Sequence, residues 1–219
     1  LKNYKSIFPI KSSEKLAGIV ADLIGDGNLQ GDPRWRIDFT SKDVKELRRF
    51  ERQISSLFNV KCYIRKCNSN VLGKTYNISM NCSPISRILF LCGVPSGQKV
   101  LSPFKVPVWI ISNKKYFKRF VQRLFSCEGH IMYEIGRSPR IRIEMWKAEK
   151  YFQEGIKFMN TLANYLRIYY SIQSTLMKKS AFNTRKDGII TRPIALNITG
   201  NSVLRFYKFI GFEGTKQDQ

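Results

Sequence analysis

The sequence predicts an α+β fold made of two pseudo-symmetric halves, because one pattern of helices and strands occurs twice along its 219 residues. Each copy opens with an apolar helical stretch that ends in a carboxylate and a glycine, Asp26-Gly27 in the first copy and Glu128-Gly129 in the second. The carboxylates and the glycines keep the same offset of 102 positions. Strand-type alternation and a charged helix follow each stretch, which gives both halves the order αββαββα.

The elements expected in the first half follow from apolar periodicity, turn residues and glycine stops. Ser12 or Ser13 provides the N-cap of the first helix, and Gly93 follows the last one. In chain order, the elements expected with definite bounds are the helical stretch 16–27, strand 35–42, helix 43–58, strands 61–67 and 75–81, and helix 83–91; the first strand of the half is expected without definite bounds. The turn-rich segment 68–74 joins the last two strands as a hairpin loop.

The second half repeats this arrangement after a basic segment that contains Pro103 and Pro107. Its elements expected with definite bounds are the helical stretch 117–129, strand 141–147, helix 148–166, strands 169–177 and 189–199, and helix 202–210. We therefore expect an N-terminal half over residues 1–96, a linker over 97–115 and a C-terminal half over 116–219.

The charge of the chain indicates its class of partner. Lys and Arg number 38 and Asp and Glu 16, which gives a formal net charge of +22. With 43% hydrophobic and 13% aromatic residues, the chain has enough apolar surface to fold and is not a disordered basic tail. A folded domain with this charge indicates a polyanionic partner, most often nucleic acid. No apolar run reaches the roughly 18–20 residues of a membrane span, so no membrane partner is expected.

The cysteine and histidine content limits the possible chemistry. Five cysteines without a C-x-x-C pair, and His130 as the single histidine, do not make a four-ligand zinc site. Reduced thiols are expected, as in a cytoplasmic or organellar, nucleoid-associated protein that is not secreted. Because histidine is scarce, a Ser-His or Cys-His nucleophile is disfavoured. Any catalysis is then expected from carboxylates, lysines and a metal ion.

The two apolar stretches, IVADLIGDG at residues 19–27 and VQRLFSCEG at 121–129, connect the chain to a known family. Two such motifs with matching downstream strands resemble the single-chain, two-motif LAGLIDADG homing endonucleases of the intron-encoded type. Asp22 stands where an apolar residue is usual in that family, and Gln122 and Arg123 stand where small residues usually pack. Ser41 stands where relatives often carry Gln.

The resemblance implies an active site at the ends of two motif helices that pack side by side. The small residues that would allow this approach are Ala17, Gly18, Ala21 and Gly25. The implied metal is Mg²⁺, for which Mn²⁺ can substitute, and it would lie beside the scissile phosphates. The implied metal ligands are Asp26, Glu128, Gly25 and Cys127. The implied catalytic residues are Asp26, Glu128, Lys42 and Lys147, with the lysines orienting water or stabilising negative charge.

The resemblance also implies that the antiparallel sheets form a saddle over double-stranded DNA, with strand side chains in the major groove. The candidate DNA-binding residues of the first half are Arg34, Arg36, Asp38, Arg65, Lys66, Asn77 and Ser79. Those of the second half are Arg140, Arg142, Glu144, Tyr170, Gln173, Arg192 and Asn197. Strand alternation divides them between two faces, and the sequence leaves open which face reads DNA.

Other functions remain open at this point. An RNA-binding intron-splicing maturase and a DNA-binding module that does not cleave have the same fold, and a maturase can retain both carboxylates. A basic ribosomal or architectural protein would account for the charge but not for the two acid–glycine helices. His130 is expected near the DNA as a strand residue rather than as a catalytic base.

Two further alternatives concern the first motif and the ends of the chain. Asp22 lies one turn before Asp26 and offers another register, but a glycine follows only Asp26. An intein-borne enzyme would need splicing residues at its ends, whereas this sequence opens at Leu1 and closes at Gln219. We therefore expect a free-standing, intron-encoded monomer.

Overall fold

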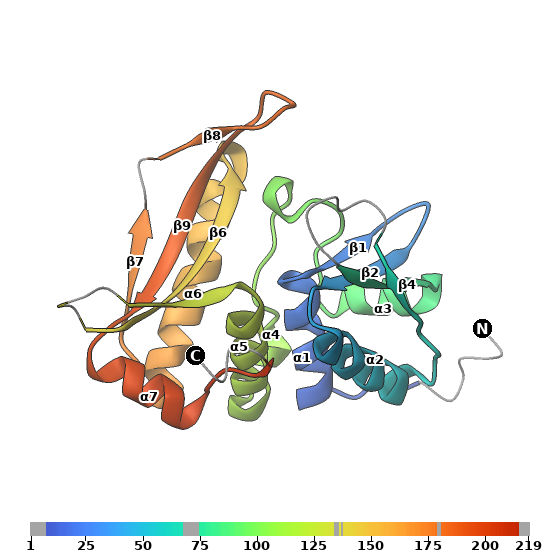
Figure 1. Ribbon diagram of the computed structural model, residues 1–219, viewed down its shortest axis with the longest axis horizontal. Coiled ribbons are helices and arrows are strands. Elements are labelled where there is room, and N and C mark those ends of the chain that lie inside the picture. Colours follow the sequence, from blue (N-terminus) through green and yellow to red (C-terminus); the bar gives the residue numbers. More distant parts are fainter. Residues whose placement is uncertain (1–7, 68–74, 134–135, 137, 179–180, 215–219) are drawn as a thin grey trace.

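The computed structural model describes residues 8–67, 75–133, 136, 138–178 and 181–214. Two helices, α1 (Glu14–Ile24) and α5 (Lys114–Glu128), pack side by side at its centre. An antiparallel sheet lies on either side of this pair (Figure 1). The architecture is therefore α+β, as the sequence predicts.

The first sheet has four strands in the order β1-β2-β4-β3, and each neighbouring pair is antiparallel. Its strands are β1 (Gly27–Gln30), β2 (Arg36–Ser41), β3 (Ile64–Lys66) and β4 (Tyr76–Asn81). Ile37, Phe39 and Ile78 are buried, whereas the residues between them are partly exposed. One face of the sheet thus joins the core, and the other remains open.

The second sheet repeats this plan. Its main path is β5-β6-β9-β7, and a short strand, β8, pairs with β9. The strands are β5 (Gly129–Met132), β6 (Arg140–Ala148), β7 (Ser174–Lys178), β8 (Asn183–Thr184) and β9 (Ile190–Ile198). Ile141, Ile143 and Leu196 are buried on the face of this sheet that packs against the helices.

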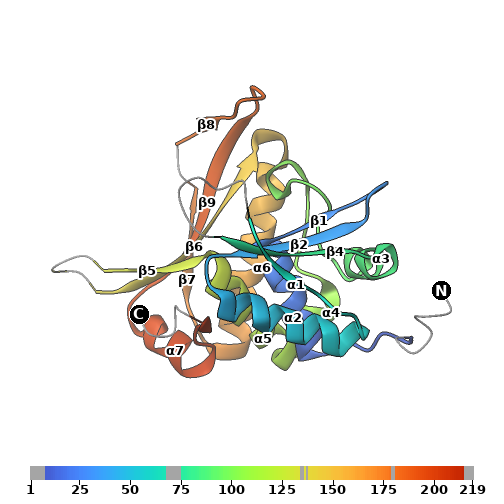
Figure 2. The same cartoon turned by 45° about the vertical axis from the view of Figure 1, so that its right-hand side comes forward.

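Helices cover the apolar faces of both sheets. Besides α1 and α5 they are α2 (Val44–Phe58), α3 (Ser83–Leu91), α4 (Val108–Ile111), α6 (Phe152–Tyr170) and α7 (Asn201–Phe209). Two 3₁₀ turns, η2 (Lys99–Leu101) and η3 (Glu149–Tyr151), complete the list. The helices α1, α2, α5 and α7 lie together below the strands of both sheets in two views (Figures 1 and 2).

Small residues allow the close contact between α1 and α5. A Cβ atom added at Gly25 would lie 2.5 Å from Cβ of Cys127, and one added at Gly18 would lie 3.1 Å from Nε of Arg119. Ala17 and Ala21 are fully buried on the same helix. The expected side-by-side packing of the two motif helices is therefore confirmed.

The order of elements matches the sequence prediction in the first half, with α3 found at the predicted residues. The second half follows the predicted order with one addition, the short strand β8, which lies in the segment expected to be a hairpin loop. The largest difference lies between strand β6 and helix α6. A helix was expected over 148–166, but Ala148 still pairs with Thr191, and η3 separates it from α6. The strand expected at 169 begins at Ser174, because Ser171 closes α6 in the left-handed conformation.

Two further segments bear on the predicted organisation. The expected hairpin loop 68–74 lies outside the described residues. The expected linker 97–115 contains η2, α4 and the first residues of α5, so part of it is ordered into helical turns. The division into residues 1–96, 97–115 and 116–219 stays a prediction. Among the described residues, no helix has the length and apolarity that a membrane span requires.

Candidate active site and nucleic-acid interface

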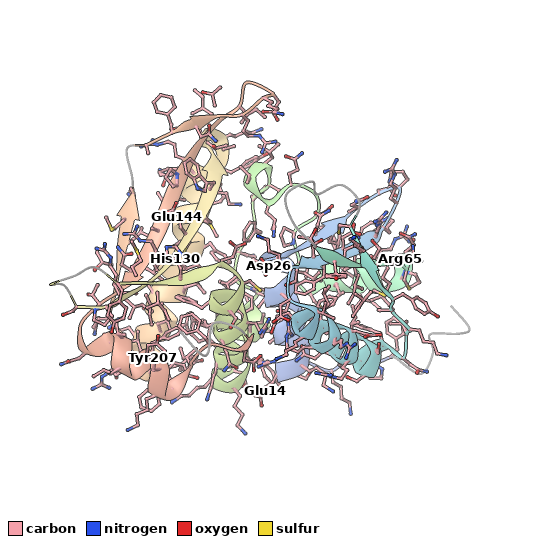
Figure 3. All side chains as sticks on the ribbon, viewed as in Figure 1. Glu14, Asp26, Arg65, His130, Glu144 and Tyr207 are labelled. Carbon is pink, nitrogen blue, oxygen red and sulfur yellow. The ribbon has the colours of Figure 1, made fainter. Side chains whose placement is uncertain are left out.

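The two motif carboxylates lie at corresponding ends of the central helix pair. Asp26 follows α1 by two positions, Glu128 is the last residue of α5, and both are exposed. Figure 3 places Asp26 between the two sheets, above the paired helices. A carboxylate at a helix C-terminus opposes the helix dipole, so a structural capping role is a poor explanation for either residue.

A lysine that the sequence did not single out interacts electrostatically with both carboxylates. Nζ of Lys99, on the turn η2, donates a hydrogen bond to the carbonyl oxygen of Ile24 at 2.7 Å and another to that of Gly25. Burial lowers the pKa of Lys99, and the negative charges of Glu128 and Asp26 act against this shift. One ammonium group therefore interacts electrostatically with both motif ends.

Gly25 and Cys127, the other two expected metal ligands, face each other across the helix pair. The carbonyl oxygen of Gly25 already accepts a hydrogen bond from Lys99. Burial raises the pKa of the Cys127 thiol, and the nearby charges of Asp22 and Asp26 raise it further. The sulfur is therefore a protonated thiol and a poor ligand for a hard cation.

A divalent metal would have to rely on the two carboxylates. Within the residues that the structure describes, no cluster of three or more His, Cys, Asp or Glu side chains could hold a metal. Asp26 and Glu128 supply hard, solvent-accessible oxygens, which suit Mg²⁺ because this ion usually keeps several waters and binds substrate phosphate. The donor set thus fits a metal that is completed by water and DNA.

The two lysines proposed for catalysis have different environments. Lys42 is exposed at the bend after β2. Lys147 is fully buried: Nζ donates to the carbonyl oxygens of Lys99 at 2.5 Å and Ser102 at 2.8 Å. It also lies 3.8 Å from the ring centroid of Phe104. The expectation that Lys147 acts directly on substrate is wrong, because alternation along β6 directs its side chain to the core face.

Two of the three unusual residues in the two motifs, Asp22 and Arg123, belong to one buried ionic cluster, whereas Gln122 donates to the carbonyl oxygen of Ile210. Asp22 has no exposed surface, and its carboxylate pairs with Arg49 at 2.8 Å and with Arg123 at 2.8 Å. Arg123 also pairs with Glu46 at 2.5 Å and with Glu213 at 3.1 Å. The alternative motif register that ends at Asp22 is therefore excluded, because this carboxylate faces the helix interface.

The open face of the first sheet is polar and internally hydrogen-bonded. Register places five predicted DNA-binding residues on it: Arg36, Asp38, Arg65, Asn77 and Ser79. Arg36 pairs with Asp38 at 2.7 Å and donates to Oγ of Ser79 at 2.6 Å. Residues on this face that the sequence analysis missed are Asn28, Gln30, Thr40 and Asn81. What indicates a role in DNA binding for these four residues is that each pairs, across the sheet, with a predicted DNA-binding residue.

The open face of the second sheet carries the matching set. Arg140, Arg142 and Glu144 alternate with buried residues along β6, and Asn197 lies opposite Arg142. Nε of Arg142 donates to Oδ1 of Asn197 at 2.7 Å. His130 also lies opposite Arg142, on β5, as expected of a strand residue (Figure 3 labels it). Residues missed on this face are Met132, Trp146, Thr175 and Met177.

Five predicted DNA-binding residues lie elsewhere. Lys66 is opposite Tyr76, on the other face of the first sheet. Arg192 is opposite Lys147 and pairs with Glu149, so it also lies on the helix side. Arg34 and Gln173 are exposed outside the strands. The prediction for Tyr170 is wrong: it ends α6, is buried, and donates its hydroxyl to the carbonyl oxygen of Lys114.

Comparison with solved structures places this geometry in a known fold. The chain superposes on the homing endonuclease I-DmoI in complex with DNA and Ca, with a TM-score of 0.58 and 15% sequence identity, over 90% of this chain and 88% of that one. For the homing endonuclease I-WcaI bound to its DNA recognition sequence, the TM-score is 0.57 and the identity 12%, over 95% and 85% of the two chains. This chain has the LAGLIDADG homing-endonuclease fold.

The same fold is also found in a protein that is not named as a homing endonuclease. Full-length DUF199/WhiA from Thermatoga maritima matches with a TM-score of 0.56 and 13% identity, over 99% of this chain and 62% of that one. A separate structure covers the N-terminal LAGLIDADG domain of that protein type. The LAGLIDADG fold alone therefore leaves the reaction to be argued from the site.

Sequence comparison finds partial matches to two kinds of longer protein. The chain is 26% identical to the tRNA-splicing ligase RtcB of Pyrococcus abyssi, over 95% of this chain and 24% of the ligase. It is 28% identical to the replication factor C small subunit of Methanocaldococcus jannaschii, over 55% of this chain and 7% of that protein. The chain thus spans a quarter or less of these relatives. No family model matches it.

Proposed function

We propose that this chain is a divalent-metal-dependent, site-specific homing endonuclease that hydrolyses both strands of a long double-stranded DNA site. The observation that supports this function best is the position of Asp26 and Glu128. They lie at the ends of two packed helices and share the electrostatic influence of Lys99, and Asp26 lies between the two sheets (Figure 3). A binding module that does not cleave has no need for two exposed carboxylates at this junction.

The residues present suit phosphodiester hydrolysis. Asp26 and Glu128 would hold Mg²⁺ or Mn²⁺, with water and DNA phosphate oxygens as the remaining donors. The bound metal would supply an activated water and would neutralise charge on the phosphate. The structures of I-DmoI with DNA and either Ca or Mn support a metal-dependent function for this fold. The ammonium of Lys99 is held near both carboxylates, where it can stabilise developing negative charge.

The two open sheet faces suit a duplex. They carry arginine, asparagine and carboxylate side chains, which can read base edges in the major groove. Their residues differ between the first and the second sheet, which favours an asymmetric recognition site for one chain acting as a monomer. The charge of +22 supports contacts with many phosphates and a location near DNA, as in a nucleoid.

The partial matches favour a transferable module over ligase or replication activity. Similar sequences occupy a fraction of two longer proteins whose names describe different processes. The feature that these two proteins have in common is a segment similar to this chain. This distribution supports the intein-borne setting more than the intron-encoded setting that the resemblance implied.

The test compares Asp26→Asn and Glu128→Gln with Glu149→Gln, which changes an exposed carboxylate outside the site. A library of plasmid inserts incubated with Mg²⁺ identifies the site, and cleavage of that site is then measured for each variant. The first two variants should lose double-strand cleavage and keep their DNA affinity in Ca²⁺ within about tenfold, because each removes one anionic metal ligand. Glu149→Gln should cut as the unmodified chain does.

Normal cleavage by Asp26→Asn or Glu128→Gln would remove these residues from the active site. Tight DNA binding without cleavage in Mg²⁺ or Mn²⁺ would favour the non-cleaving module. Preferential binding of a structured intron RNA over DNA would favour the maturase.

A further inference from the structure

The turn that carries Lys99 is held by contacts from both sheets. Next to the first sheet, the amide of Gly97 donates to the carbonyl oxygen of Leu29 at 2.8 Å. On the side of the second sheet, Arg185 donates to Oε1 of Gln98 at 2.6 Å. Lys147 adds two hydrogen bonds to the carbonyl oxygens of Lys99 and Ser102. The backbone of the turn therefore depends on a residue from β6.

The fold guides the side chain of Lys147 to this turn. A Cβ atom at Gly155 would lie 2.8 Å from Cγ of Lys147 and 2.5 Å from Cδ1 of Ile194, so α6 approaches β6 closely only because this residue is glycine. The aliphatic part of Lys147 occupies the space above Gly155. Its ammonium ends over the ring of Phe104, at the two carbonyl oxygens. Lys147 thus spans the distance between β6 and the turn.

An ionisable group at such a buried position is costly. Burial lowers the pKa of Lys147 to about 7; the carboxylate of Glu154 opposes this shift and the charge of Lys99 adds to it. A methionine could fill the same volume without the cost of desolvation. A lysine is therefore better explained by its hydrogen bonds to the turn than by packing.

We propose that Lys147 is a positioning residue for Lys99, whose ammonium it keeps on the carbonyl oxygens that end α1 by fixing the backbone of residues 99 and 102. This inference rests on the proposed nuclease function. Lys147 does not touch the reacting atoms. Its effect on cleavage passes entirely through Lys99, so a residue of the second half sets the position of a catalytic lysine next to the first motif.

A double-mutant cycle tests this dependence. Lys147→Met, Lys99→Met and the double variant are compared under single-turnover conditions with Mg²⁺, and DNA affinity is measured separately in Ca²⁺. Lys147→Met should lower the cleavage rate about 10- to 100-fold, the range expected when a catalytic group is displaced by about 1 Å. DNA affinity should change less than threefold. In the Lys99→Met background, Lys147→Met should have no further effect on the rate.

A second readout does not depend on cleavage. Hydrogen exchange of the amides in residues 97–102 should become at least tenfold faster in Lys147→Met. The control is Lys157→Met, the same substitution at an exposed position on α6, and it should change neither exchange nor cleavage. If Lys147→Met does not fold, Lys147→Gln replaces it, because its amide is polar but ends one atom short of Nζ and cannot keep both hydrogen bonds, so the same rise in exchange and fall in cleavage rate are expected.

Each outcome decides the inference. The inference is overturned if Lys147→Met lowers the cleavage rate equally with and without Lys99. It is also overturned if hydrogen exchange in residues 97–102 is unchanged, or if both Lys147 variants unfold. A chain that cuts no DNA refutes the nuclease function instead. In that case faster exchange in Lys147→Met would still support the contact between Lys147 and the turn, and unchanged exchange would refute both.

Discussion

Replacing Asp22 by asparagine should destabilise the fold while leaving the active-site carboxylates intact. Asp22 has no exposed surface and accepts hydrogen bonds from Nη1 and Nη2 of Arg49 and from Nε of Arg123, at 2.8, 2.9 and 2.8 Å. An asparagine keeps one acceptor oxygen and directs an N–H group at guanidinium donors. The change therefore removes a charge from the buried cluster and adds a donor–donor contact.

The expected loss is large because the partners cannot return to water. Arg123 is buried, and Glu46 and Glu213 would be left to balance both guanidinium groups. Removing one partner of a buried ion pair costs about 3–5 kcal/mol. A domain of this size loses about 2–4 °C in Tm for each kcal/mol, which gives a fall of roughly 6–20 °C. This loss is a large part of a total stability of about 5–15 kcal/mol.

Urea unfolding followed by far-ultraviolet circular dichroism measures this loss. Glu149→Gln is the control, because it breaks an exposed pair with Arg192 that is worth less than about 1 kcal/mol. At low temperature, where Asp22→Asn remains folded, it should still cut DNA, unlike Asp26→Asn. A loss of stability below about 1 kcal/mol for Asp22→Asn would show that the ionic cluster does not stabilise the helix interface.

Three more predictions follow from charge, asymmetry and burial. If about 8 phosphates are neutralised, the logarithm of DNA affinity should fall with the logarithm of salt concentration at a slope of roughly −7. A filter-binding titration measures this slope, and a value shallower than about −2 would contradict an extended interface. Selection from random DNA should return a non-palindromic site of about 14–20 base pairs, because strands of about 7 residues at about 3.3 Å per residue set the length that each half can read. A short palindrome would instead require a homodimer. Because the pKa of Lys147 is lowered to about 7, the unfolded chain binds more protons than the folded chain between about pH 7 and pH 10.5. The stability of the unmodified chain relative to Lys147→Met should therefore rise with pH in this window, and equal urea midpoint differences at pH 7 and pH 9 would contradict a buried neutral amine.

The sequence predicted elements well where the signals are local. Ser13 caps α1 through a hydrogen bond to the amide of Leu16, and the helix over 83–91 appears at the predicted residues. Prediction failed where an element ends because of a distant partner. Ala148 has helix-forming character, yet it remains in β6 because Thr191 pairs with it across the sheet. Nothing within a few residues of Ala148 specifies that pairing.

Prediction of the candidate site also succeeded where the signal is local and failed where it depends on distant residues. Asp26 and Glu128 could be predicted because each follows an apolar helix and precedes a glycine. Lys99 could not be, because its closeness to both carboxylates depends on how residues 97–102 cross between the sheets. A direct catalytic role was predicted for Lys147 from its position at the end of a strand, and the sequence does not reveal which face of β6 is open. The register with β9 settles that question, since Lys147 shares its face with residues buried against α6.

Of the three unusual residues in the two motif stretches, Asp22 and Arg123 make sense only as a pair. At the motif offset of 102, Asp22 corresponds to Leu124, and Arg123 corresponds to Ala21. Neither motif therefore carries both charges. Two copies of the first half would bring two buried aspartates together, and two copies of the second half would bring two buried arginines together. Like charges at a desolvated interface are strongly unfavourable, whereas Asp22 and Arg123 attract each other at 2.8 Å. The helix interface thus favours pairing of the first half with the second, which is the arrangement that one chain with an asymmetric DNA site requires.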